Sequence, residues 1–284
     1  MAEQRTYPEG VTSWIDTEQA DLDAAADFYG GVFGWTFSEA TPPGVPFCYL
    51  VAQLDGRDVG GLGGPAAPSA DTDREGPARW HTYVAVDDAD AMARRVEAAG
   101  GVVVRPPTAA GEGGRSVVVR DRQGLEVRLW EARRRLGSQV TNAPGAWNFS
   151  DLHTEDPAAA QVFYERAFGW AFADVGFATM IRVPGYGDHL AATVDPGIHE
   201  PQAGVGVPPG FADAIGWVVP VVPVAPGGEP GWHVTFTVAD RDEAADRVVR
   251  LGGSVVRTDE SGWTRTAVVR DPQGAVFTVS QFLG

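Results

Sequence analysis

A long internal duplication constrains this chain more than any other feature of its sequence. Three runs of the first half recur in the second: residues 27–35 as 162–170, residues 80–87 as 232–239, and residues 118–124 as 268–274. A repeat of this length predicts two similar domains. We place these domains at residues 1–135 and 146–284.

Each half divides again into two modules that open in the same way. A short strand leads into an acidic turn, an amphipathic helix that ends near glycine, and further strands. The four predicted modules cover about residues 11–63, 79–131, 146–194 and 231–282. A Pro/Gly-rich segment, residues 195–230, has no counterpart of equal length in the first half, and we expect it to be an insertion. The sequence leaves open whether the modules pair within a half, between the halves, or across a homodimer.

The composition excludes several classes of function. With 44% hydrophobic and 21% charged residues, the chain is globular rather than disordered. Its formal net charge of -16 argues against nucleic acid or an anionic membrane as a partner. All 22 basic residues are arginine, so chemistry that needs a lysine amine, such as a Schiff base with pyridoxal phosphate, is excluded.

The cellular compartment is predicted from what the sequence lacks. Residues 1–10 show no basic region followed by an apolar stretch, so no secretory signal is visible. The longest apolar run is interrupted by Pro220 and Pro223 and is too short to span a bilayer. We therefore expect a cytoplasmic protein. The single cysteine, Cys48, cannot form an internal disulfide, and we assign it no role.

Strand alternation predicts which side chains share a face of the sheet. Within residues 125–130, the apolar set Leu125, Val127 and Leu129 should pack on the helices. The opposite face then carries aromatic and ionisable side chains together: Trp14, Asp16, His81, Tyr83, Glu126, Arg128 and Trp130. A sheet face of this make-up is typical of a binding cleft.

Four motifs occur once in each half. They are the pairs Phe28-Tyr29 and Phe163-Tyr164, the helix ends Gly34-Trp35 and Gly169-Trp170, the strands of His81 and His233, and the Asp-x-Gln-Gly turns at Asp121 and Asp271. Together they resemble the vicinal oxygen chelate superfamily, which includes glyoxalase I, bleomycin and fosfomycin resistance proteins, and extradiol dioxygenases. The resemblance covers nearly the whole chain. It implies an α+β fold of tandem βαβββ modules, two domains of two modules each, with curved mixed sheets and helices on the outside.

The resemblance also implies four strand positions at which metal-using members hold a cation. In this chain they fall at Trp14 and Phe149, near residues 60–61 and 191–192, at His81 and His233, and at Arg128 and Thr278. Each half therefore keeps one ligand of four, and an arginine beside the site would repel a divalent ion. We predict no metal site and no cofactor. A divalent nickel, zinc, manganese or iron ion would need the unusual ligands Asp16, His81 and Glu126.

These residues support a hypothesis of small-molecule binding without metal, for sequestration or acid/base chemistry. Trp14, Tyr83 and Trp130 offer aromatic faces, and Arg128 offers charge-assisted hydrogen bonds to a carbonyl or carboxylate. The second domain presents a different predicted binding set: Phe149, Asp151, His233, Thr235 and Thr278.

The chemistry of the first cleft stays open between several alternatives. If the protein is an enzyme, His81 is the expected general acid or base, oriented by Asp16 or Glu126, in a lyase or isomerase step. One alternative is a metal-dependent lyase or a dioxygenase. Another is a non-catalytic interaction protein with vestigial clefts. An enzyme of either kind would have a small molecule as its partner. The sequence leaves open whether the protein forms a homodimer.

Overall fold

The computed structural model describes residues 5–41, 46–65, 77–176, 178–200, 208–221 and 229–283. The chain forms two compact units. Unit 1 consists of Met1–Ser13, Thr82–Gly137 and Ser150–Trp232, and unit 2 of Trp14–His81, Ser138–Phe149 and His233–Gly284. Unit 1 therefore combines the second and third predicted modules, and unit 2 combines the first and fourth. The domain boundaries at residues 1–135 and 146–284 stay a prediction.

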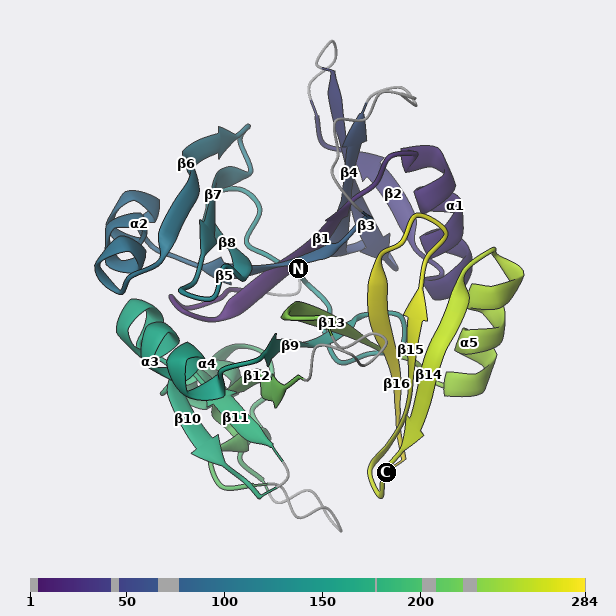
Figure 1. Cartoon of the computed structure of the whole chain (residues 1–284). Helices are drawn as coiled ribbons and strands as arrows, with labels where there is room; N and C mark the ends of the chain where they lie inside the picture. The colour runs from purple at the N-terminus through teal and green to yellow at the C-terminus, as the bar shows by residue number, and fades with distance from the viewer. Residues whose placement is uncertain are drawn as a thin grey trace. The chain divides into compact units, whose positions relative to one another are not determined.

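Helices and strands alternate in the order expected from the duplication (Figure 1). The first half contains β1 (Thr12–Glu18), α1 (Leu22–Phe33), β2 (Thr36–Glu39), β3 (Phe47–Leu54), β4 (Arg57–Pro65), β5 (Trp80–Ala85), α2 (Ala89–Ala98), β6 (Val102–Ala110), β7 (Gly114–Arg120) and β8 (Glu126–Ala132). The second half contains β9 (Trp147–Thr154), α3 (Pro157–Phe168), β10 (Ala171–Asp174), β11 (Thr179–Arg182), α4 (Tyr186–Thr193), the 3-10 turn η1 (Phe211–Asp213), β12 (Ala214–Pro220), β13 (Gly231–Thr237), α5 (Arg241–Arg250), β14 (Ser254–Glu260), β15 (Thr264–Arg270) and β16 (Val276–Phe282).

Hydrogen bonding orders these strands into two mixed sheets. The strand orders are β2-β3-β4-β1-β5-β8-β7-β6 and β10-β11-β12-β9-β13-β16-β15-β14. In each module the first strand pairs in parallel with the last, as β1 does with β4 and β5 with β8, while the intervening pairs are antiparallel. The predicted α+β fold of tandem βαβββ modules is therefore confirmed.

The helices begin where the acidic turns predicted them. Asp21, Asp88, Asp156 and Asp240 each accept a hydrogen bond from a backbone N–H of the first turn, which satisfies one of the unpaired donors there. Helices α1 and α3 both end at a glycine in the left-handed conformation, Gly34 at φ 75° and Gly169 at φ 72°. The repeated Gly-Trp motif is therefore a helix stop followed by a core tryptophan.

The segment 195–230 differs from the expected insertion. It contains β12, which pairs in parallel with β9 as β4 pairs with β1, so it supplies the last strand of the third module. This strand was not predicted from the sequence. Pro220 ends it and a second proline follows closely, and closely spaced prolines are typical of a linker. The positions Ala191 and Ala192 lie in α4 rather than on a strand. Residues 201–207 and 222–228 of the segment lie outside the described residues.

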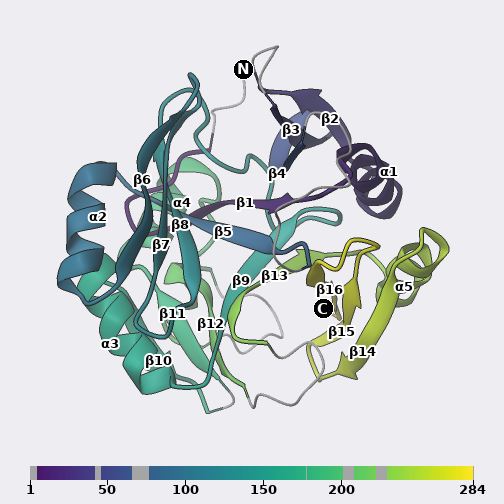
Figure 2. The same cartoon turned by 45° about the horizontal axis from the view of Figure 1, so that its top comes forward.

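Each unit has its own hydrophobic core. In unit 2 the core joins side chains of α1 and α5, and in unit 1 it joins side chains of α2 and α3. Figures 1 and 2 show the two helices of each pair side by side. The predicted strand faces are confirmed at Val127 and Leu129, which are buried in the core of unit 1 while Arg128 lies between them on the other face.

The repeated motifs join the two modules of each unit. In unit 2 the hydroxyl of Tyr29 donates to the Asp271 carboxylate at 2.8 Å and accepts from Trp80 Nε1 at 3.2 Å. In unit 1 Tyr164 donates to Asp121 at 3.4 Å and accepts from Trp232 Nε1 at 3.1 Å. We call each Trp-Tyr-Asp set a clamp.

The clamps are structural because all their polar groups are buried and satisfied. Burial raises the pKa of both tyrosines, which stay protonated and donate. Gln273 then bonds both the N–H and the carbonyl of Asp21, and Gln123 does the same for Asp156, so each Asp-x-Gln-Gly turn holds a helix N-terminus of the other module. The clamps therefore account for the pairing of the first module with the fourth and of the second with the third.

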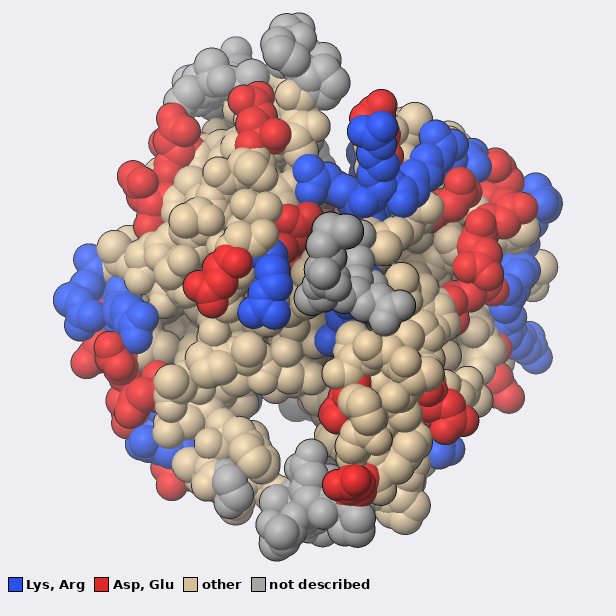
Figure 3. All heavy atoms as spheres, turned by 180° about the vertical axis from the view of Figure 1, so that it is seen from behind, with Lys and Arg blue, Asp and Glu red and all other residues tan. Residues whose placement is uncertain are grey.

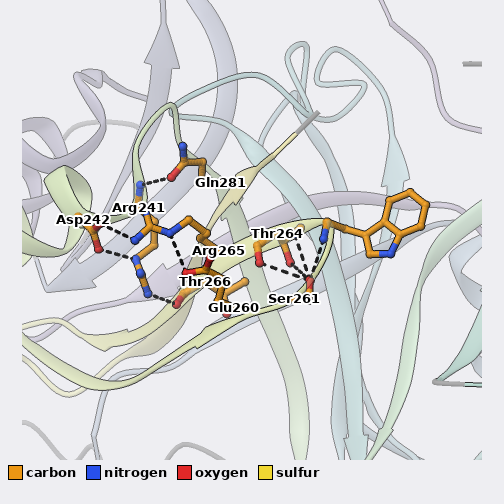
Figure 4. Close-up of polar contacts among 9 residues, drawn as sticks. Arg241, Asp242, Glu260, Ser261, Thr264, Arg265, Thr266 and Gln281 are labelled. Carbon is orange, nitrogen blue, oxygen red and sulfur yellow. Dashed lines mark hydrogen bonds and ion pairs between the residues drawn. The ribbon is translucent and has the colours of Figure 1, made fainter. Parts of the chain in front are cut away.

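Ion pairs anchor the helices that follow β5 and β13. In Figure 4 Arg265 bridges Asp242 and Glu260, and the backbone N–H of Arg241 donates to Gln281. The first half has a matching bridge from Arg115 to Asp90 and Glu131. Acidic and basic side chains are interspersed over the face drawn in Figure 3, as on an ordinary solvated surface. In the described part of the chain, no helix is long and apolar enough to cross a membrane.

Candidate functional site

A buried arginine among aromatic rings is the most unusual feature of unit 1. Arg128 of β8 is 6% exposed and lies opposite Tyr83 of β5 in the strand register. Its Nη1 donates to the Tyr83 hydroxyl at 3.1 Å, and its guanidinium carbon lies 5.7 Å from the centre of that ring. The Trp130 ring meets Tyr83 edge-on at 6.3 Å. The structure thus brings three predicted binding residues together.

A carboxylate of the same strand lies close to this arginine. The Glu126 carboxylate lies 3.4 Å from Arg128 and 4.0 Å from Arg120. Glu126 therefore acts here as an ion-pair partner of Arg128. A buried guanidinium binds oxygen anions and polarised carbonyl oxygens well, because it is a cation with several N–H donors.

In unit 2 a chain of hydrogen bonds connects Trp14, Tyr49 and Asp16. Trp14 Nε1 donates to the Tyr49 hydroxyl at 2.8 Å, and that hydroxyl donates to Asp16 Oδ2 at 3.1 Å. Asp16 is 2% exposed, so a phenol hydroxyl is an important partner for its carboxylate. Sequence reasoning predicted Trp14 and Asp16 but missed Tyr49.

Glycines in β4 create the space for Tyr49. A Cβ added at Gly61 would collide with the Tyr49 hydroxyl, and one added at Gly63 would lie 2.7 Å from the ring of Phe47. The aromatic side chains of β3 thus cover the glycines of β4. The signal for this was the Gly-rich run of residues 60–64 opposite Phe47 and Tyr49, because glycine in a strand often marks close packing against it.

The remaining predicted residues lie on β5, β9, β13 and β16. His81 lies half-buried in β5, two residues before Tyr83 and on the same face of that strand. Its role as general acid or base stays a prediction. His233 of β13 lies 2.8 Å from Thr278 Oγ1 through Nε2, and Thr235 pairs with Thr278 in the strand register. Phe149 is half-buried in β9.

Asp151 of β9 has a different environment from Asp16. Its Oδ1 accepts a hydrogen bond from the backbone N–H of Trp217 at 3.1 Å. Burial raises the pKa of Asp151 to about 7, against the lowering effect of that N–H. The second half therefore holds a carboxyl group that changes protonation near neutral pH.

The side chains at the family's metal positions do not fit a cation in the first half. The phenol of Tyr49 fills the space that a ligand side chain at Gly61 would need, and Arg128 places a fixed positive charge at another position. Within the described residues no group of three or more His, Cys, Asp or Glu side chains is arranged to hold a metal ion.

Family models and relatives of known name match this chain along most of its length. Residues 19–129 match the model of the Glyoxalase/Bleomycin resistance protein/Dioxygenase superfamily, and residues 149–280 match that of the glyoxalase-like domain. A Mycobacterium tuberculosis protein named "Putative glyoxylase CFP32" is 33% identical, over 98% of this chain and 97% of that protein. The anthracycline biosynthesis protein DnrV of Streptomyces peucetius is 33% identical, over 96% of this chain and 94% of that protein.

Solved structures share the fold at lower sequence identity. The 2,3-dioxygenase LapB from Pseudomonas sp. KL28 gives a TM-score of 0.59 at 15% identity, covering 97% of this chain and 93% of that one. The Mn(II)-bound glyoxalase from Novosphingobium aromaticivorans gives 0.57 at 17% identity, covering 96% and 83%. From its two family matches and its full-length relatives, the chain belongs to the glyoxalase/bleomycin resistance protein/dioxygenase superfamily.

Proposed function

We propose that this protein binds a small planar aromatic compound with carbonyl or phenolic oxygens, and that it does so without a metal ion. The observation that carries the proposal is the buried guanidinium of Arg128 beside the rings of Tyr83 and Trp130. The rings supply flat apolar surface, and the cation supplies hydrogen bonds to oxygen. The name of the anthracycline biosynthesis relative agrees with an aromatic, oxygen-rich ligand.

Arginine replaces the metal in this proposal as the positive group that orients the ligand. A guanidinium donates several hydrogen bonds in one plane and keeps its charge at every accessible pH, so it can hold a phenolate or a polarised carbonyl. Binding of this kind is sufficient for sequestration. Acid/base chemistry would require His81 in addition, as predicted from the sequence.

The test uses 1,2-dihydroxyanthraquinone, a planar aromatic compound with phenolic and quinone oxygens. Its dissociation constant is measured by quenching of tryptophan fluorescence and checked by calorimetry. Arg128→Gln should weaken binding by about tenfold or more, and Arg128→Lys by less, because lysine keeps the charge but loses the planar geometry. The exposed Arg105→Gln serves as the matched control and should bind like the wild type.

Two results would overturn the proposal. Equal binding by folded Arg128→Gln and wild-type protein would remove the arginine from the site, and absence of binding by both would favour vestigial clefts. A stoichiometric nickel, zinc, manganese or iron ion in protein purified without chelator, lost in His81→Ala, would favour a metal-dependent lyase or dioxygenase. Elemental analysis decides the second point without knowledge of the substrate.

A further inference from the structure

Among the edge strands of the two sheets, β14 is both long and free of proline. In the described part of the chain the sheets end in β2, β10, β6 and β14. β2 and β10 have four residues each, and β6 contains Pro106 and Pro107. Short strands and prolines both prevent pairing with a further strand. β14 has seven residues, all of them exposed except Val256, and Figure 2 shows it beyond β15 at the end of its sheet.

We propose that β14 is an interaction surface that pairs with β14 of a second copy of this chain. The two strands run antiparallel about a twofold axis at Thr258, and the sheet continues from one copy into the other. The second copy is the partner because the backbone and the charges of β14 both complement their own twofold image. The interface does not involve Arg128, so it stands or fails independently of the function proposed above.

The backbone of β14 directs hydrogen-bonding groups to the open edge at Thr258. The hairpin of β14 and β15 closes with the Ser261 N–H bonded to the Thr264 carbonyl at 2.9 Å, and Figure 4 shows these two residues in contact. Bonded and non-bonded residue pairs alternate along an antiparallel ladder. Thr258, opposite Ala267, is the third pair from the hairpin pair and is therefore non-bonded. Its N–H and C=O point away from β15, where a twofold-related Thr258 can accept and return both hydrogen bonds.

Two opposite charges flank Thr258 on one face of the strand. Arg257 and Asp259 are both exposed, and they lie opposite Val268 and Thr266 of β15. The ion pairs that Arg265 makes with α5 and with the end of β14 do not include either side chain. With the axis at Thr258, Arg257 of each copy is opposite Asp259 of the other, so two cross-strand ion pairs form.

These charges also select the register of the pairing. An axis at Arg257 would place that arginine opposite itself, and an axis at Asp259 would place two carboxylates opposite each other. Both arrangements are unfavourable, because like charges directly opposite on neighbouring strands repel. The register that pairs the two threonines is thus favoured by the backbone and by the side chains together.

Helix α5 leaves room for the second copy. It packs across β14, β15 and β16, so its axis lies over the sheet and not over the open edge. With neighbouring strands about 4.8 Å apart, the two α5 helices would be roughly 14 Å apart, more than the 8–10 Å of helices in direct contact. The helices therefore do not collide across the twofold axis.

Exposed apolar side chains lie at both ends of the paired strands. Trp263, at the tip of the hairpin, is 46% exposed, and Val255, near the start of β14, is 39% exposed. Antiparallel pairing brings the hairpin tip of one copy next to the start of β14 in the other. Burial of these side chains adds apolar area to the interface at both ends.

Analytical ultracentrifugation of the full chain, from low micromolar to millimolar concentration, tests the proposal. A buffer of physiological ionic strength is used because it screens the formal net charge of -16 on each copy. We expect a monomer–dimer equilibrium for the wild type. Thr258→Pro should weaken the dimer with little change in the melting temperature, because it removes an N–H that β15 does not use.

Charge reversal assigns the interface to β14. Arg257→Asp and Asp259→Arg should each weaken self-association about tenfold or more, because each places like charges opposite each other at two positions. An equimolar mixture of these two variants should form a heterodimer, since every facing pair is then of opposite charge. Arg105→Asp, the same charge change on the proline-protected edge strand β6, is the matched control and should dimerise like the wild type.

Three outcomes would overturn the proposal. The first is a wild-type protein that stays monomeric at millimolar concentration. The second is a dimer whose dissociation constant is the same in folded Arg257→Asp and Asp259→Arg protein, which would place the interface elsewhere. The third is a mixture of the two variants that associates no better than either variant alone. None of these results changes the expected dependence of 1,2-dihydroxyanthraquinone binding on Arg128.

Discussion

Asp16 and Asp151 occupy matching positions in the duplicated strand, yet they have different partners. Asp16 accepts a hydrogen bond from a phenol that is itself held by Trp14, whereas Asp151 accepts one from a backbone N–H beside two aromatic rings. The clamps of the two units, in contrast, repeat the same Trp-Tyr-Asp pattern. The duplicated scaffold has kept the groups that join its modules, while the groups on its predicted binding faces have diverged.

The largest expected effect is on the free energy of unfolding, and it should differ between the two clamps. Asp271 accepts from Tyr29, Gln19 and two backbone N–H groups, whereas Asp121 accepts from Tyr164, at a longer distance, and two backbone N–H groups. Asp271→Ala leaves more buried donors unsatisfied and should lower the free energy of unfolding by about 3–5 kcal/mol. Asp121→Ala should cost about 2–3 kcal/mol.

Urea denaturation measures both clamp variants, with Tyr29→Phe as the conservative control at about 1–2 kcal/mol. Equal losses from Asp271→Ala and Asp121→Ala would show that the additional donor from Gln19 contributes nothing.

The second prediction concerns the two aspartates and pH. The pKa of Asp151 is raised in the folded protein, so its contribution to stability is fully present below the pKa of the unfolded chain and is lost as pH rises to about 7. Asp151→Asn removes this loss and should stabilise the protein at pH 8 by at most about 4 kcal/mol, with a smaller gain toward pH 5. Asp16→Asn should instead destabilise, because it weakens the bond from Tyr49.

Urea unfolding of both variants at pH 5 and pH 8 tests the contrast. A constant gain from Asp151→Asn across this range would contradict the raised pKa.

The third prediction tests the packing of Tyr49 over the glycines. Gly61→Ala pushes the phenol away from Trp14 and Asp16 and should cost about 1–3 kcal/mol of stability. In Tyr49→Ala protein the same substitution should cost much less, because the colliding hydroxyl is gone. Gly262→Ala is the control, since a Cβ there meets open space. Additive losses from Gly61→Ala and Tyr49→Ala in a double-mutant cycle would contradict the contact.

The smallest effect is expected at the matching surface bridges. Arg115 and Arg265 each contact two carboxylates and are about equally accessible, at 24% and 28% exposed. Arg115→Gln and Arg265→Gln should each lower the melting temperature only slightly, and by less in high salt. Thermal unfolding at two ionic strengths measures this. A large difference between the two variants would show that the halves have diverged here as well.

The sequence predicted much of the fold because its signals are local. The aspartate caps, the left-handed glycines 34 and 169, and the alternation around Arg128 depend on residues that are near one another in the chain. The sequence did not predict β12, because closely spaced prolines such as those at the end of this strand are typical of a linker. It also missed Tyr49, whose role depends on a hydrogen bond to Asp16 and on glycines of the neighbouring strand.

By itself, the sequence determined the duplication, the four modules, the order of helices and strands within most of them, and the superfamily. Tertiary structure decided which modules share a core and which side chains meet. The bond from Tyr29 to Asp271 links residues 242 positions apart, and nothing in the sequence favours it over a bond to Asp121. Periodicity reports the face on which a residue lies, whereas the partner on that face depends on packing between distant segments.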